Sequence, residues 1–98
     1  MSYAKRTDHN QTEIVALLRK MGASVWITSA LGKGAPDFVV GIRSVNLLVE
    51  CKDGSKCASR RNLTPHEADF HANWKGQICI IESMDEAIAL INRIGISK

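Results

Sequence analysis

Residues 47–52 constrain the fold of this chain more than any other segment. Leu47, Leu48 and Val49 are apolar in succession, which is typical of a strand buried on both faces at the centre of a sheet. Because side chains alternate along a strand, one face carries Leu47, Val49 and Cys51, and the other carries Leu48, Glu50 and Lys52. The buried strand therefore ends in two opposite charges on one face, and buried charges need partners.

The rest of the chain supplies helices and strands around this segment. Apolar spacing predicts a helix over residues 10–21, and capping boxes at residues 64–67 and 83–86 predict two further helix starts. Strands are predicted over residues 24–28, 37–42, 45–52 and 77–82, with a glycine-containing loop at residues 31–36. The order α-β-β-β-α-β-α predicts an α/β fold: a mixed four-stranded sheet flanked by helices, with a crossover to the last strand.

Length and composition exclude several classes of protein. The 98 residues, 45% of them hydrophobic, predict one globular domain over residues 1–98 with its core at about residues 10–95. The longest apolar runs span five residues, whereas a membrane helix needs about 18, so no membrane partner is expected. The N-terminus leads into no signal segment, and the three cysteines form no CxxC, so we expect a cytoplasmic protein with free thiols. No Walker loop or dinucleotide fingerprint is present, so no nucleotide cofactor is expected.

Charge is divided unevenly along the chain. Residues 1–62 carry ten Lys and Arg against five Asp and Glu, whereas residues 63–98 carry three against five. A basic N-terminal portion suits a phosphate-bearing partner, and it suits an ordinary soluble surface equally well.

A second carboxylate is expected next to the charged strand end. Asp37 opens the strand predicted before residues 45–52, so an antiparallel pairing would place it beside Glu50 and Lys52. Two neighbouring carboxylates raise each other's pKa unless a positive charge lies between them. A divalent cation such as Mg²⁺ supplies that charge, activates water and neutralises a phosphate oxygen. The alternative is a solvent-facing Glu–Lys pair and a turn aspartate, but the buried strand favours a site.

These residues resemble a known signature. Gly34-Ala35-Pro36-Asp37 followed by Leu48-Val49-Glu50-Cys51-Lys52 is similar to the motif of PD-(D/E)xK nucleases, which have a restriction-endonuclease-like core. Gly32-x-Gly34-x-Pro36-Asp37, Leu63-Thr64-Pro65 and Trp74-x-Gly76 further resemble the small stand-alone VRR-NUC nucleases of viruses and bacteria. That family in turn resembles archaeal Holliday junction resolvases, and the resemblance covers nearly the whole chain.

The resemblance implies roles for four residues. Asp37 and Glu50 would bind Mg²⁺ or Mn²⁺, together with the main-chain carbonyl of Cys51. Lys52 would position or activate the attacking water. The implied protein is an intracellular phosphodiesterase of bacterial or viral origin that acts as an endodeoxyribonuclease.

Two glutamates have open assignments. Glu13 matches an acidic residue that such nucleases carry on the first helix, and it could equally form a capping box with Asn10. Glu67 stands where similar sequences often have glutamine. It shares a helical arc with Phe70 and Trp74, so it could face the site, or it could act only as the capping-box glutamate.

Cations near the motif complete the predicted site, whereas the nearby aromatic residues and histidines are assigned no role in it. Lys33, Lys56, Arg60 and Arg61 are the candidate nucleic-acid contacts, because Lys and Arg neutralise phosphates without reading sequence. Phe70 and Trp74 are interpreted as core residues, and His66 and His71 as surface or packing residues.

The leading hypothesis is a metal-dependent DNA endonuclease acting on branched or structured DNA such as four-way junctions. The alternatives are a non-catalytic nucleic-acid-binding module on the same fold and an interaction protein with a fortuitous signature. A homodimer is expected from the small size, and because cutting both strands of a two-fold-symmetric junction needs two sites.

Overall fold

The computed structural model describes residues 9–53 and 62–94. Along them lie helix α1 (His9–Lys20), strand β1 (Ser24–Ile27), the short 3₁₀ helix η1 (Ser29–Leu31), strands β2 (Phe38–Ile42) and β3 (Val45–Cys51), helix α3 (Pro65–Asn73), strand β4 (Ile78–Ile81) and helix α4 (Met84–Arg93). The predicted order α-β-β-β-α-β-α is confirmed, and η1 is an addition that the sequence did not indicate.

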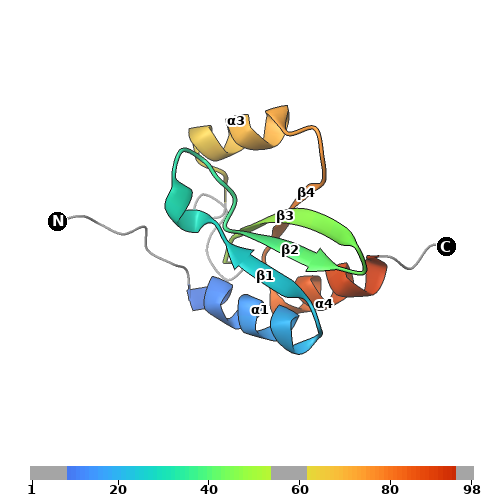
Figure 1. Cartoon of the computed structure of the whole chain (residues 1–98). Helices are drawn as coiled ribbons and strands as arrows, with labels where there is room; N and C mark the ends of the chain where they lie inside the picture. The colour runs from blue at the N-terminus through green and yellow to red at the C-terminus, as the bar shows by residue number, and fades with distance from the viewer. Residues whose placement is uncertain (1–8, 54–61, 95–98) are drawn as a thin grey trace.

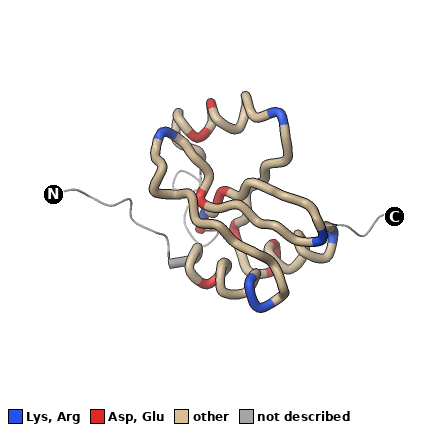
Figure 2. The backbone as a smooth tube through the Cα atoms, in the orientation of Figure 1, with Lys and Arg blue, Asp and Glu red and all other residues tan. Residues whose placement is uncertain are grey.

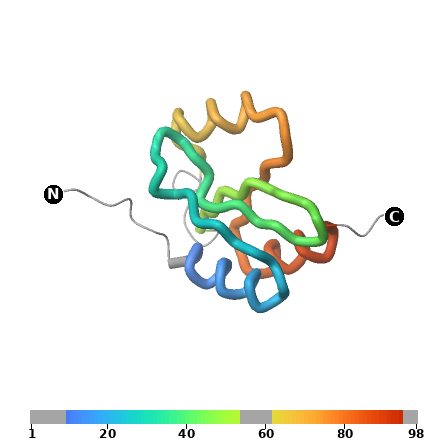
Figure 3. The backbone as a smooth tube through the Cα atoms, in the orientation of Figure 1, coloured from blue at the N-terminus to red at the C-terminus, as the bar shows by residue number. Residues whose placement is uncertain are grey.

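The four strands of the described residues form one mixed sheet in the order β1-β2-β3-β4. Strands β1, β2 and β3 are antiparallel neighbours, and β4 runs parallel to β3 after the crossover through α3. Strand β3 therefore has a partner on each side, as its continuous apolar sequence predicted. Figure 3 traces this path, with the chain returning from α3 to the far side of β3.

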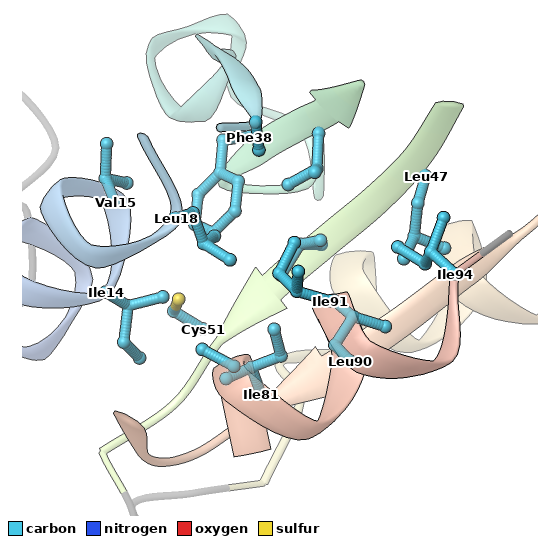
Figure 4. Packing of buried hydrophobic residues seen from close by; sticks show 14 residues of the cluster. Ile14, Val15, Leu18, Phe38, Leu47, Cys51, Ile81, Leu90, Ile91 and Ile94 are labelled. Carbon is cyan, nitrogen blue, oxygen red and sulfur yellow. The ribbon is translucent and has the colours of Figure 1, made fainter. Parts of the chain in front are cut away.

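Helices α1 and α4 cover one face of the sheet, and α3 lies over the other (Figure 1). The core lies on the first face, where side chains of α1 and α4 point toward β2 and β3 (Figure 4). It contains Ile14, Val15 and Leu18 of α1, Phe38 and Val40 of β2, Leu47, Val49 and Cys51 of β3, and Ala87, Leu90 and Ile91 of α4. The alternation predicted for β3 is confirmed, since its core-facing residues are the three that the sequence assigned to that face.

The β2–β3 hairpin is closed by Arg43 and Ser44, whose φ angles are +51° and +65°. Two consecutive positive φ angles are typical of the turn that best matches strand twist, although these residue types seldom occupy it. The Arg43 guanidinium donates to the carbonyl oxygens of Ile91 (2.8 Å) and Ile94 (3.0 Å) at the end of α4. The turn thereby satisfies helix-terminal carbonyls and ties α4 to the sheet.

Candidate active site

Asp37 is held at the start of β2 by the neighbouring strand. The Cys51 N–H donates to Asp37 Oδ2 at 2.7 Å, and the Asp37 N–H donates to the Val49 carbonyl at 3.0 Å. The Asp37 carbonyl in turn accepts from the Thr28 N–H at 2.9 Å. Asp37 is only 5% exposed, so these bonds fix a buried carboxylate at the point where β3 ends.

Glu50 lies directly beside Asp37, because the β2–β3 register pairs Phe38 with Val49. Glu50 is 1% exposed and shares a hydrogen bond with Asp37. Burial raises the pKa of Glu50 to about 9, and the charge of Asp37 adds to the effect. The antiparallel pairing expected from the sequence is confirmed, and the neighbouring Asp37 contributes to the raised pKa of Glu50.

Lys52 places a cation beside this pair. Its Nζ lies 2.8 Å from Glu67 Oε1 and 3.9 Å from Glu50 Oε2. Burial by itself lowers the pKa of Lys52, but the hydrogen bond and charge of Glu67, together with the charges of Glu50 and Asp37, outweigh it and raise that pKa. Lys52 is therefore a fixed positive charge at the strand end.

Glu67 fulfils both roles that its position allowed. Thr64 is the N-cap of α3, its hydroxyl accepting from the Glu67 N–H at 3.2 Å, and Glu67 Oε1 accepts from the Thr64 N–H at 2.9 Å. The same Oε1 accepts from Lys52 Nζ. Burial raises the pKa of Glu67, but the hydrogen bonds from Lys52 and Thr64 lower it on balance. The capping box thus orients the carboxylate that holds Lys52.

The glycine-containing loop is packed against the same turn of α3. Gly34 has φ +81°, and a Cβ at this position would collide with the His66 carbonyl and approach the Glu67 nitrogen to 2.9 Å. Glycine is required here both for its backbone conformation and for the close approach. The loop that leads into Asp37 is thereby docked on the helix that carries Glu67.

The two buried carboxylates suit a divalent cation. Glu50 Oε1 is buried and has no hydrogen-bond partner among the described residues, which is costly for a carboxyl oxygen unless a ligand binds it. No set of three or more His, Cys, Asp or Glu side chains in residues 9–53 and 62–94 has the arrangement of a metal centre. Mg²⁺ is usually held by one or two carboxylates, with water and phosphate completing its coordination. The Asp37–Glu50 pair therefore fits a Mg²⁺ ion whose remaining coordination positions are filled by water and phosphate oxygens.

The structure brings together Asp37, Glu50, Lys52 and Glu67, and Figure 2 shows acidic and basic positions meeting where β2 begins and β3 ends. Glu13 lies on α1 with an exposed side chain. Asn10, within α1, donates from Nδ2 to the carbonyls of Lys52 (2.9 Å) and Glu82 (3.3 Å). The proposed Asn10 cap is wrong, because α1 already begins at His9 and the amide binds the strand ends instead.

The candidate cations divide between two parts of the chain. Lys33 is exposed in the loop before Asp37. Lys56, Arg60 and Arg61 lie outside the described residues.

Sequence reasoning offered Glu67 as a residue that faces the site, but it did not foresee the direct ion pair with Lys52 or the role of Asn10. The capping box signals only the main-chain partner of Glu67, and no local pattern connects residues that lie 15 or 42 positions apart. The core assignment of Trp74 is wrong, since its side chain is 42% exposed and stacks on Phe70 with ring centroids 5.5 Å apart.

None of the described helices has the length and apolarity needed to cross a membrane.

A mixed four-stranded sheet with helices on both faces, and with two carboxylates and a lysine at the meeting ends of β2 and β3, has the arrangement of the restriction-endonuclease-like fold class. A solved structure described as a VRR_NUC domain matches this chain with a TM-score of 0.64 and 24% identity, covering 86% of this chain and 91% of the other. No family model and no curated protein matches the chain. The chain therefore has the fold of a VRR_NUC domain, as the resemblance predicted.

Proposed function

We propose that the chain is a metal-dependent DNA endonuclease in which Asp37 and Glu50 hold Mg²⁺ or Mn²⁺. The observation that carries this proposal is the pair of buried, adjacent carboxylates, one oxygen of which has no partner among the described residues, with Lys52 within 4 Å. The resemblance adds the Cys51 main-chain carbonyl as a further ligand. When bound, the ion supplies an activated water and neutralises charge on the phosphate.

The chain's own residues have separate tasks in this reaction. Asp37 is fixed by the Cys51 N–H, so it presents its carboxylate without rearrangement. Glu50 gives up the proton favoured by burial when it becomes a ligand. Lys52, held by Glu67, orients the attacking water and stabilises the developing negative charge. Hydrolysis adds the water oxygen to phosphorus, breaks one P–O ester bond and leaves a proton on the departing oxygen.

Branched or structured DNA is the proposed substrate and a homodimer the proposed active form. The described part of one chain holds one such site, and cutting both strands of a two-fold-symmetric junction requires two sites related by symmetry. Lys33 is exposed in the loop that leads into Asp37, and we propose that it contacts a phosphate of the bound DNA.

The test is cleavage by purified protein of four-way junctions, flaps and linear duplex with Mg²⁺ or Mn²⁺. We expect the junction or flap to be cut and Asp37→Ala and Glu50→Ala to be inactive. Asp85→Ala is the matched control, because Asp85 is an exposed carboxylate on α4, across the sheet from the site. Cleavage that survives in both site variants would refute the assignment, and full DNA binding without cleavage would favour a non-catalytic module.

Sedimentation as a monomer, free and on DNA, would refute the dimer.

A further inference from the structure

Trp26 is a large exposed aromatic side chain on the edge strand β1, with 68% of its surface accessible. The register places it opposite Val39, which in turn pairs with Leu48. Its neighbour Val25 packs against the core, so Trp26 points to the other face of the sheet. That is the face on which Glu50 lies, because Leu48 and Glu50 are two residues apart on β3.

The exposed indole lies one row of side chains from the candidate active site. The Thr28 N–H bonds to the Asp37 carbonyl, so the row formed by Asp37 and Glu50 begins two residues after Trp26 along β1. Two residues of a strand span about 7 Å. Val39 and Leu48, in the row of Trp26, are only partly buried, so α3 does not seal this side of the sheet.

Cations lie on either side of Trp26. Arg19 Nη2 donates to the Val25 carbonyl at 3.1 Å, which places a guanidinium at the open edge of β1. Lys33 is exposed in the loop before Asp37. Figure 2 shows basic positions both at the end of α1 and in the loop that precedes β2. A negatively charged strand could therefore pass over the aromatic ring while its phosphates stay near positive charge.

We propose that Trp26 is a stacking platform for an unpaired base next to the scissile phosphate. This inference rests on the proposed nuclease function and narrows its substrate class to DNA that contains unpaired nucleotides. Aromatic side chains bind single strands because every base has a π-face, and one stacked base contributes about 1–3 kcal/mol. In a fully paired duplex the bases are stacked on one another, so the platform has no ligand.

A second copy of the chain fits this face less well than nucleic acid does. The centres of protein interfaces are depleted of charged residues. Here Trp26 lies one row from two carboxylates, and Lys52 lies one row further on. This mixture of acidic metal-binding groups, an aromatic ring and flanking cations suits a phosphate-bearing ligand.

The direct test uses the fluorescence of Trp26 itself. The chain has two tryptophans, so the Trp74→Phe variant leaves Trp26 as the only indole and preserves an aromatic partner for Phe70. We would titrate it with oligothymidylate of about 12 nucleotides, and with a duplex of equal length, in a chelator that prevents cleavage. We expect the single strand to quench Trp26 emission and the duplex to leave it nearly unchanged. Absence of quenching at saturating single strand would overturn the proposal.

Affinity measurements on side-chain variants complete the test. Trp26→Ala should weaken oligothymidylate binding about tenfold, the effect of losing about 1.4 kcal/mol of stacking, and Trp26→Phe should recover most of it. Leu31→Ala is the matched control, because Leu31 is 71% exposed but lies in η1 rather than on the sheet. Unchanged affinity in Trp26→Ala would overturn the platform, and so would a loss seen only as dissociation of a dimer in sedimentation.

Parallel cleavage assays distinguish this inference from the proposed function. Quenching by single strands without any cleavage in Mg²⁺ or Mn²⁺ would refute the nuclease and leave Trp26 as a base-binding residue. Cleavage with no quenching would refute the platform and leave the nuclease in place.

Discussion

At the scale of single residues, the raised pKa of Glu50 should make the stability of the metal-free protein depend on pH. Its pKa is raised from 4.5 to about 9 by burial first and by Asp37 second. Between these pH values the folded protein keeps a proton on Glu50 that the unfolded chain loses. The free energy of unfolding should therefore fall as pH rises through this range.

Glu50→Gln should remove this pH dependence in protein free of divalent ions. The amide has a similar shape but never ionises, so the variant should become more stable than the wild type as pH increases. We expect a gain of at least about 1 kcal/mol at pH 8 and little difference at pH 5, measured by denaturant unfolding in a chelator. Asp85→Asn, a similar change on the exposed side of α4, should show no such trend. A constant difference between Glu50→Gln and the wild type across pH would contradict the assigned cause.

Metal binding should be linked to the same proton. Mn²⁺ or Mg²⁺ requires an ionised Glu50, so its binding should release about one proton per site near pH 7. Calorimetry in buffers of different ionisation enthalpy would measure this release. Binding without proton release would mean that Glu50 is already ionised or is not a ligand.

At the scale of secondary-structure elements, the first turn of α3 contains a residue, Glu67, that belongs both to the helix cap and to the candidate site. Thr64→Ala removes the cap that accepts from the Glu67 N–H and should cost about 1 kcal/mol of stability with little loss of cleavage. Glu67→Ala should also release Lys52 from its 2.8 Å partner, so that its ion pair with Glu50, 3.9 Å in the structure, can tighten and oppose metal binding. We expect its cleavage rate to fall about 10-fold to 100-fold. Equal effects of the two variants on stability and cleavage would show that Glu67 is only a cap.

The loop before β2 offers a matched pair of glycines. Gly34 and Gly32 have φ angles of +81° and +73°, but only Gly34 approaches α3, whereas nothing lies within 4 Å of a Cβ at Gly32. Gly32→Ala should cost about 1 kcal/mol for its backbone conformation alone. Gly34→Ala should cost at least about 1 kcal/mol more, because the loop must separate from the His66 carbonyl. Thermal unfolding of both variants measures the difference, and equal losses would contradict the docked loop.

At the scale of the whole molecule, the sequence predicted the arrangement of strands well because their signals are local. The apolar run of β3 indicated a central strand, and its alternation correctly separated Cys51 from Glu50. The expected pairing of Asp37 with Glu50 followed from an antiparallel hairpin. Each of these inferences depends on neighbours along one strand or across one turn.

The sequence did not predict features that depend on packing between distant elements. In α4, Met84 and Ile88 are each 37% exposed although they follow the same apolar spacing as the buried Ala87 and Ile91, and Leu90 is buried as well. Two further contacts join residues far apart in the chain: the hydrogen bond from Asn10 to the Lys52 carbonyl, and the ion pair between Glu67 and Lys52. No local sequence pattern indicates either contact.

The two faces of the sheet have different roles, one in the hydrophobic core and one in the candidate site. One face is covered by α1 and α4 and holds the hydrophobic core (Figure 4). The other carries Asp37, Glu50 and Lys52 beneath the first turn of α3, with Trp26 exposed nearby. Strand β3 links them, because its alternate residues contribute to the core and to the site.

We propose that Asp37 and Glu50 share one divalent cation at the end of β3. Anomalous diffraction from crystals soaked in Mn²⁺ tests it most directly. We expect one strong peak about 2 Å from carboxylate oxygens of both residues, and loss of that peak in Glu50→Gln crystals. An empty site at a Mn²⁺ concentration that supports DNA cleavage, or a peak bound by other residues, would contradict it.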